Sequence, residues 1–286
     1  MEPYTIEGLR ARDYPGGTIE VRWVYTTTTT HTRYYVAYPS DGLTITGVMN
    51  VPHGQGPFPV IILNHGYIPP DRYWSGADTW FASGYLAQHG YLTVSPDFRG
   101  WGGSDSGASY FRTGPLIDAL NLLSSLPSLP QADPERVGMW GHSMGGGVTT
   151  KAITIDPRIK AAVLYGPVSA DDAKVIARWG AWSRGGDAEG VLQRAHLQAA
   201  RDPAFLRRTS PLYHFDLVIA PVQIHQGAAD TVTPSRWAQA IRDALTAADK
   251  EVAYYEYEGQ GHAFQGPSWD LFMERVTHFF DQHLKR

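Results

Sequence analysis

The feature that most constrains the fold is a regular alternation of short apolar runs with longer helical patterns. The runs are rich in Val, Ile, Leu and aromatic residues, as in strands buried on both faces of a sheet; they are residues 60–63, 91–94, 136–140, 161–165, 222–225 and 252–257. Helical spacing fills the intervals, at residues 79–89, 115–126, 146–155, 234–247 and 269–283. Strands that alternate with helices predict a parallel sheet covered by helices on both faces.

Three further strand-like runs precede this alternation, at residues 18–30, 31–38 and 43–51. They are rich in β-branched and aromatic residues, which favour strands. We therefore predict an α/β fold with a mostly parallel, eight-stranded sheet. A chain of 286 residues is long enough for one large core, so we expect residues 1–286 to form a single domain.

One connection is much longer than the others. More than fifty residues separate the run that ends near Gly166 from the run that begins at Val222, far above the usual connection length. Within it, residues 168–213 combine aromatic and charged side chains with helical spacing in places. We interpret this segment as a small helical cap inserted over the sheet; a long crossover with one extra helix is the alternative.

A pentapeptide between a predicted strand and a predicted helix indicates a nucleophile. Gly141-His142-Ser143-Met144-Gly145 matches G-x-S-x-G, follows the run at 136–140 and precedes the helix at 146–155. A strand that turns sharply into a helix exposes the serine hydroxyl at the sheet edge, and small residues are needed in so tight a turn. Ser143 is therefore the predicted nucleophile.

A serine nucleophile needs a base, and the base needs a group that orients it. Asp230 follows the run at 222–225 after a glycine turn, and His262 lies in a small-residue loop after the run at 252–257. The order Ser, acid, His is the one that this strand–turn–helix arrangement uses. Both residues follow strands, so we expect them at the same sheet edge as Ser143. An acid just before a helix can instead be an N-cap, which is the alternative for Asp230.

Two backbone amides are candidates for an oxyanion hole. Asn64-His65-Gly66-Tyr67 follows the run at 60–63, and Met144 follows the serine. Hydrolases with this turn use one N–H from each of these places, so we expect the amides of Tyr67 and Met144 to stabilise the oxyanion. An ordinary strand-ending turn is the alternative for the first loop.

The aromatic residues of the loops are candidates for substrate binding. Trp101 follows the run at 91–94, and three more aromatic residues lie in the predicted cap; they are Trp179, Trp182 and Phe205. The sequence shows no His, Asp and Glu cluster with the spacing of metal ligands, and its loosely spaced glycines do not match a dinucleotide-binding turn. We expect neither a metal nor a cofactor.

Charge and composition limit the partners. The formal net charge is −4 and there are no cysteines, so no basic footprint for nucleic acid is present and a cysteine nucleophile is excluded. No segment is apolar over a bilayer's thickness, and we expect no membrane partner. The amino terminus lacks the features of a signal peptide, which favours the cytoplasm; secretion stays open if a signal peptide has been removed. The sequence carries no indication of the oligomeric state.

With these motifs in place, the chain resembles the α/β-hydrolase superfamily, and within it the catalytic domains of the prolyl oligopeptidase and dienelactone hydrolase groups. The resemblance begins near Thr44 and rests on the segments 64–67, 97–100, 141–146, 227–230 and 259–262. It implies an α/β-hydrolase fold and a serine hydrolase activity. Two departures stand out: dienelactone hydrolases use a Cys nucleophile, and the residues before Leu43 are too few for the propeller of prolyl oligopeptidases.

These observations favour an esterase for short-chain or aryl esters, with feruloyl and acetyl esters as candidate substrates. A small peptidase or amidase and a thioesterase stay open, because all of them pass through the same acyl-enzyme. A peptidase would need a polar anchor for the peptide terminus, and Asp171, Asp172 and Glu189 are the candidates in the insertion. A catalytically inactive binding module is disfavoured by the complete Ser, Asp and His set.

Overall fold

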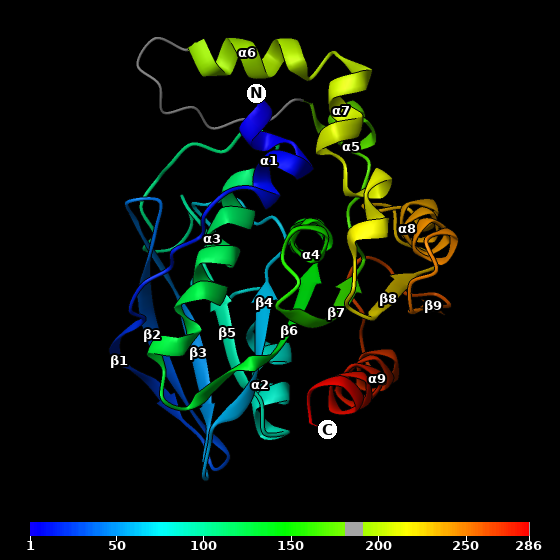
Figure 1. Cartoon of the computed structure of the whole chain (residues 1–286). Helices are drawn as coiled ribbons and strands as arrows, with labels where there is room; N and C mark the ends of the chain where they lie inside the picture. Colours follow the sequence, from blue (N-terminus) through cyan, green and yellow to red (C-terminus); the bar gives the residue numbers. More distant parts are fainter. Residues whose placement is uncertain (181–190, 286) are drawn as a thin grey trace.

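The computed structural model describes residues 1–180 and 191–285 and shows a twisted sheet flanked by helices (Figure 1). In these residues the sheet has nine strands, in the order β1-β2-β3-β5-β4-β6-β7-β8-β9. The strands are β1 (Glu20–Thr27), β2 (His31–Ser40), β3 (Leu43–Pro52), β4 (Phe58–Asn64), β5 (Leu92–Pro96), β6 (Ala132–His142), β7 (Ile159–Tyr165), β8 (Val222–Gly227) and β9 (Val252–Tyr257).

The prediction of a mostly parallel α/β sheet is confirmed, but the predicted number of eight strands is wrong. Strands β5, β4, β6, β7, β8 and β9 pair in parallel, and β1, β2 and β3 extend the sheet with antiparallel pairings. The nine strands correspond to the nine strand-like runs of the sequence, so the number eight is one too few. The edge strand β1 pairs only with β2 and leaves Val21 and Trp23 about half exposed. Its β-branched and aromatic residues suit an edge strand paired on one side.

Helices cover both faces of the sheet, and the alternation of side chains along the strands explains why. In β4, Ile62 joins the core beneath α3, α4 and α8, whereas Ile61 and Leu63 join the core beneath α2 and α9. The helices are α1 (Ile6–Arg10), α2 (Trp80–Gln88), α3 (Thr113–Ser125), α4 (Met144–Ile155), α5 (Asp172–Trp179), α6 (Val191–Ala199), α7 (Pro203–Thr209), α8 (Ser235–Ala247) and α9 (Pro267–Leu284). Burial on both faces requires the continuous apolar runs seen in the sequence.

The parallel strands all end at the same sheet edge. Strands β4, β6, β8 and β9 are followed there by the loops that carry Tyr67, Ser143, Asp230 and His262. Sites of open α/β sheets form outside the carboxyl ends of their strands, so the topology gathers these residues.

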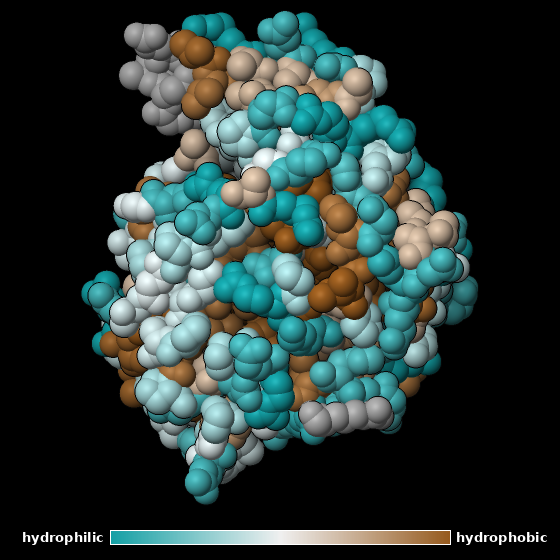
Figure 2. Space-filling model, viewed as in Figure 1, coloured by the Kyte–Doolittle hydropathy of each residue, from teal (hydrophilic) through white to brown (hydrophobic). Residues whose placement is uncertain are grey.

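The long connection between β7 and β8 contains α5, α6 and α7, which Figure 1 shows at the top of the molecule, beyond the carboxyl ends of the strands. Trp182, one of the predicted substrate-binding residues, falls outside the described residues. On the face shown in Figure 2, polar side chains cover most of the surface and apolar ones gather in its middle. None of the helices in residues 1–180 and 191–285 is both long and apolar enough to span a bilayer.

Candidate active site

Ser143 occupies a strained turn between β6 and α4. Its backbone has φ 54° and ψ −114°, a region that side chains other than glycine rarely adopt and that persists only where the surroundings enforce it. A Cβ on Gly145 would lie 2.0 Å from the carbonyl oxygen of Asn64, so the turn can pack against β4 only with glycine there. Ser143 is thereby held at the start of α4, where it lines a pocket.

Asp230 and His262 form a hydrogen-bonded pair beside this turn. The distance from His262 Nδ1 to Asp230 Oδ2 is 2.7 Å. The other carboxylate oxygen, Oδ1, accepts hydrogen bonds from the amides of Val232 at 2.8 Å and Thr233 at 2.9 Å. Burial would raise the pKa of Asp230, but the hydrogen bonds from His262 and Thr233 lower it to about 2. The carboxylate is therefore ionised and fixes the Nδ1–H tautomer of His262.

The alternative role of Asp230, as the N-cap of the following helix, is not supported by the structure. Helix α8 begins at Ser235 with Pro234 as its N-cap, and no side chain caps it. The Thr233 hydroxyl turns instead toward the pair, 2.8 Å from Asp230 Oδ2 and 2.9 Å from the Gly166 carbonyl. Asp230 is directed at His262 and at its own turn, away from α8.

Ser143 and His262 line the same pocket. No hydrogen bond joins the two side chains in the described part of the chain, and His262 Nε2 has no protein partner there. Catalytic hydrogen bonds are often long before substrate binds. The geometry leaves Nε2 available to a hydroxyl or to a substrate in the pocket.

The loop after β4 lies against Ser143. A Cβ on Gly66 would approach Ser143 Cβ and Asp78 Oδ2, both to 3.2 Å, so a larger residue here would require these neighbours to shift by a few tenths of an ångström. The next residue, Tyr67, lines the pocket together with Met144. Neither backbone N–H of this pair donates a hydrogen bond to another described residue, as an oxyanion hole requires.

A second histidine–carboxylate pair, which the sequence analysis missed, links three of these loops. His142 Nδ1 lies 3.0 Å from both carboxylate oxygens of Asp78, and His142 Nε2 lies 3.0 Å from the carbonyl oxygen of His262. Asp78 Oδ2 also accepts the Gly66 amide at 2.6 Å. Both nitrogens of His142 face acceptors, so both must donate, which makes the ring an imidazolium.

The charges of this second pair support each other. Burial lowers the pKa of His142, but Asp78 outweighs this effect and raises it. Burial likewise raises the pKa of Asp78, yet the His142 charge and hydrogen bond lower it to about 2. The pair therefore connects the loop of Gly66 and Tyr67, the residue before Ser143 and the loop of His262 through ionised groups.

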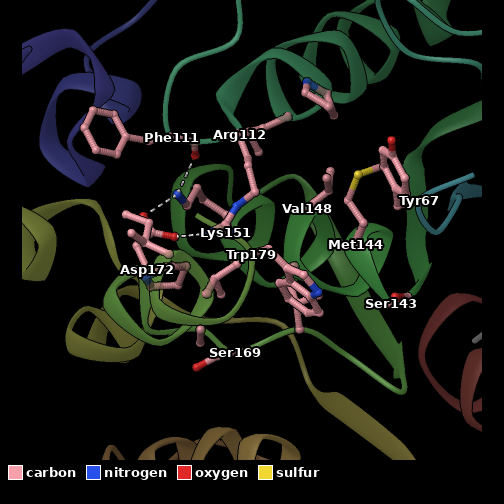
Figure 3. Close-up of a pocket in the computed structure, with 18 of the residues that line it drawn as sticks. Tyr67, Phe111, Arg112, Ser143, Met144, Val148, Lys151, Ser169, Asp172 and Trp179 are labelled. Atoms are coloured by element: carbon pink, nitrogen blue, oxygen red, sulfur yellow. Dashed lines mark hydrogen bonds and ion pairs between the residues drawn. The ribbon is translucent and has the colours of Figure 1, made fainter. Parts of the chain in front are cut away.

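The pocket beside Ser143 has a volume of about 440 Å³. Its walls come from one face of α4, from one face of α5 and from the start of α3, and most of the side chains are apolar (Figure 3). An apolar cavity with a few polar groups is typical of a site for a small organic molecule.

The structure separates the aromatic residues predicted to bind substrate. Trp179 lines the pocket at the end of α5 and is 47% exposed. Trp101 is 1% exposed and outside the pocket lining, because its Nε1 donates to the Ile68 carbonyl at 2.7 Å and its ring packs beside His65. Phe205 also lies outside the lining, against Phe111. Trp101 and Phe205 instead pack against the lining residues Tyr67 and Phe111, so their direct contact with a substrate stays a prediction.

A protein-family model matches most of the chain. Residues 78–286 match the model of the prolyl oligopeptidase family. The chain belongs to that family. The matched segment contains Ser143, Asp230 and His262, and the predicted resemblance to α/β-hydrolase serine hydrolases is confirmed.

The curated relatives of this prolyl oligopeptidase family member include an esterase. The esterase FrsA of Escherichia fergusonii is 30% identical over 129 residues, which is 44% of this chain and 30% of FrsA. The chain thus matches less than half the length of the curated relatives.

Two solved structures share the fold over almost the whole chain. An acetyl xylan esterase from Paenibacillus sp. R4 has a TM-score of 0.70 at 18% identity, covering 98% of this chain and 92% of its own. An acylaminoacyl peptidase from Pyrococcus horikoshii has a TM-score of 0.69 at 22% identity, covering 91% of this chain and 43% of its own. At these identities the likeness establishes the α/β-hydrolase fold.

In residues 1–180 and 191–285, no three His, Asp or Glu side chains gather as a metal site would require. The described residues at this pocket supply a serine hydroxyl, an oriented histidine and two backbone amides.

Proposed function

We propose that the chain is a serine carboxylesterase that forms its acyl-enzyme on Ser143. One observation carries the proposal: the ionised Asp230 orients His262 at the same pocket into which the strained turn directs Ser143. This arrangement supplies the nucleophile, the base and the group that orients the base.

The reaction follows from these positions. His262 Nε2 accepts the hydroxyl proton of Ser143 while Oγ attacks the ester carbonyl, and the amides of Tyr67 and Met144 hold the resulting oxyanion. Collapse of this intermediate expels the alcohol, which takes the proton from His262. Water then attacks the acyl-enzyme with His262 again as base, and the carboxylic acid leaves.

The pocket favours an ester with a small or moderately long acyl group, including aryl, acetyl and feruloyl esters. Its apolar walls and its volume of about 440 Å³ suit such groups. The similarity to an esterase, FrsA, and to an acetyl xylan esterase also supports an ester substrate.

A small peptidase or amidase is the second candidate, because the family model is that of the prolyl oligopeptidases. The acids considered as anchors for a peptide amino terminus have other partners. Asp171 caps α5 through the Ala173 amide, and Asp172 pairs with Lys151 and Arg112. Glu189 lies outside the described residues. A thioesterase would use the same residues.

Hydrolysis of 4-nitrophenyl esters beside aminoacyl 4-nitroanilides tests the proposal. We expect turnover of the acetyl and butyryl esters that disappears in Ser143→Ala, with anilide hydrolysis at least about a hundredfold slower, since the amide is the less reactive acyl donor. Anilide turnover equal to ester turnover would favour the peptidase, and no Ser143-dependent turnover of either would refute both.

A further inference from the structure

Helix α4 forms one wall of the pocket, and the lining residue farthest from Ser143 on this helix is the basic residue Lys151. Met144, Val148 and Lys151 line the pocket from successive turns of this helix, as their i, i+4, i+7 spacing requires. Figure 3 shows Ser143 on one side of the pocket, Lys151 on the other and the two apolar residues between them. Eight residues of helix correspond to about 12 Å, so a chain bound to Ser143 that follows α4 ends near Lys151.

The far end of the pocket holds two cations and one carboxylate. Lys151 Nζ lies 3.2 Å from Asp172 Oδ2, and the Arg112 guanidinium pairs with the other oxygen of the same carboxylate. The side chains of Lys151 and Asp172 are 7% and 3% exposed. Asp172 is the only acid among the described residues that line the pocket. Because Lys151 and Arg112 both pair with this single carboxylate, one positive charge is left in excess.

His196 from α6 also lines this pocket. It is 1% exposed, and neither ring nitrogen makes a hydrogen bond to any described residue. Its ring packs against Phe111, whose carbonyl oxygen lies 3.5 Å from Lys151 Nζ. An unpaired buried polar group is costly and calls for an explanation such as a missing ligand.

Backbone strain marks the same place. Phe111 and Arg112 are consecutive residues with φ 49° and 57°, left-handed values that favour glycine. Together they direct the Phe111 carbonyl and the Arg112 guanidinium toward Lys151 and Asp172. Strain of this kind persists where a structure holds groups in place for function.

The ionisation of these groups agrees with an incompletely neutralised site. Burial lowers the pKa of Lys151, Asp172 raises it and Arg112 lowers it again. Burial raises the pKa of Asp172, but Lys151 and Arg112 together lower it. The Lys151 ammonium is thus buried and shares its counterion, Asp172, with Arg112. A second anion beside it would stabilise the ammonium.

We propose that this end of the pocket, formed by Lys151, Arg112 and His196, binds a carboxylate at the far end of the acyl chain. The inference rests on the proposed function and names its substrate class, monoesters of dicarboxylic acids. Ser143 displaces the alcohol, the acyl-enzyme keeps its free carboxylate on Lys151, and water releases the dicarboxylic acid. The apolar stretch along Met144 and Val148 accommodates the methylene chain.

The wild-type enzyme tests this directly. Mono-4-nitrophenyl esters of adipic, suberic and sebacic acids are compared with the same esters in which the distal carboxylate is methylated. For at least one chain length we expect kcat/KM of the charged ester to exceed that of the methylated one by about 10- to 100-fold, the range of a charge-assisted hydrogen bond. 4-Nitrophenyl acetate serves as the test of the proposed function in the same assay.

Two lysine variants locate the effect. Lys151→Met removes the excess positive charge from the pocket and leaves Arg112 paired with Asp172. Lys174→Met removes a positive charge from the exposed surface of the neighbouring helix α5. The ratio of the two kcat/KM values, charged over methylated, should fall to about one in the first variant and stay at the wild-type value in the second. Lys151→Arg should retain part of the preference.

The outcomes separate the two proposals. Ser143-dependent hydrolysis of the acetate without a preference for any charged ester would overturn the dicarboxylate inference and leave the esterase intact. A preference that survives Lys151→Met would overturn the assignment to this end of the pocket. Absence of all ester hydrolysis would refute the esterase and the inference with it. The wild-type comparison decides the matter even if Lys151→Met fails to fold.

Discussion

Two histidine–aspartate pairs lie side by side at the sheet edge, with the rings of His142 and His262 only 4.7 Å apart, yet they differ in what they leave free. In the pair of His262 and Asp230, one ring nitrogen is bound and the other faces the pocket. In the pair of His142 and Asp78, both nitrogens are bound, one by the carboxylate and one by the His262 carbonyl. An imidazole can accept a proton only through a free nitrogen. The first pair is therefore suited to act as a base, and the second to hold the first in place.

The largest expected loss of activity comes from a change of Asp230, the acid that orients His262. Asp230→Asn should lower kcat by about 10⁴-fold, because the amide stabilises the wrong tautomer of His262, while KM changes little. Turnover of 4-nitrophenyl acetate and the urea midpoint are measured on the same preparation. If turnover were near normal and the free energy of unfolding fell by about 1 kcal/mol, Asp230 would act only as a helix cap.

A change in the second pair should have a smaller effect on catalysis and a larger one on stability. In Asp78→Asn the Gly66 amide and the His142 ring lose a charged acceptor, so the loops of Tyr67 and His262 are less well held. We expect kcat to fall by about tenfold, with a stability loss of about 2 kcal/mol from the charge-assisted hydrogen bonds. If kcat fell as far as in Asp230→Asn, Asp78 would have to act on the base itself.

The pH dependence of that stability loss distinguishes an ion pair from simple packing. Asp78 has a folded-state pKa of about 2, so its contribution is present above its unfolded pKa of about 3.9 and disappears as the pH falls toward 2. The pKa of His142 is raised, so its contribution is complete below about 6.5 and declines as the pH rises through the raised value. Urea unfolding of wild type and Asp78→Asn should thus differ most between about pH 4 and 6.5. A difference that is constant from pH 3 to 9 would argue against the ion pair.

The smallest effect is expected from a wall residue that touches neither pair. Trp179 lines the pocket at the end of α5, so Trp179→Ala should shift the preferred acyl chain of 4-nitrophenyl esters toward longer chains, with a severalfold change in the ratio of kcat/KM values. Phe205→Ala is the matched control, because Phe205 lies behind the wall. Equal chain-length profiles in the wild type and Trp179→Ala would remove Trp179 from the acyl pocket.

The sequence predicts what depends on local pattern. The apolar runs predict the parallel strands because burial on both faces leaves no polar positions, and the turn around Ser143 is recognisable because its glycines are close in sequence. The run at residues 18–30 also predicts the edge strand β1, although its side chains are largely exposed and lack the pattern of a buried strand.

Long-range contacts are what the sequence could not provide. Asp78 and His142 are 64 residues apart, and nothing near Asp78 distinguishes it from a surface acid. Trp101 was expected at the cleft because it lies in a loop, but its indole N–H finds the Ile68 carbonyl and allows full burial. In the sequence, nothing distinguishes Lys151 from an ordinary helical lysine; only the fold places Asp172 of α5 against it.

Trapping of the nucleophile tests the central claim most directly. A fluorophosphonate forms a covalent bond to a serine only where a base activates the hydroxyl and an oxyanion hole holds the phosphoryl oxygen. Intact-mass and peptide mass spectrometry should show one adduct per chain, located on Ser143, with complete loss of esterase activity, no adduct in Ser143→Ala and strongly slowed labelling in Asp230→Asn. An adduct on another residue, or full activity in a chain labelled at Ser143, would contradict the account.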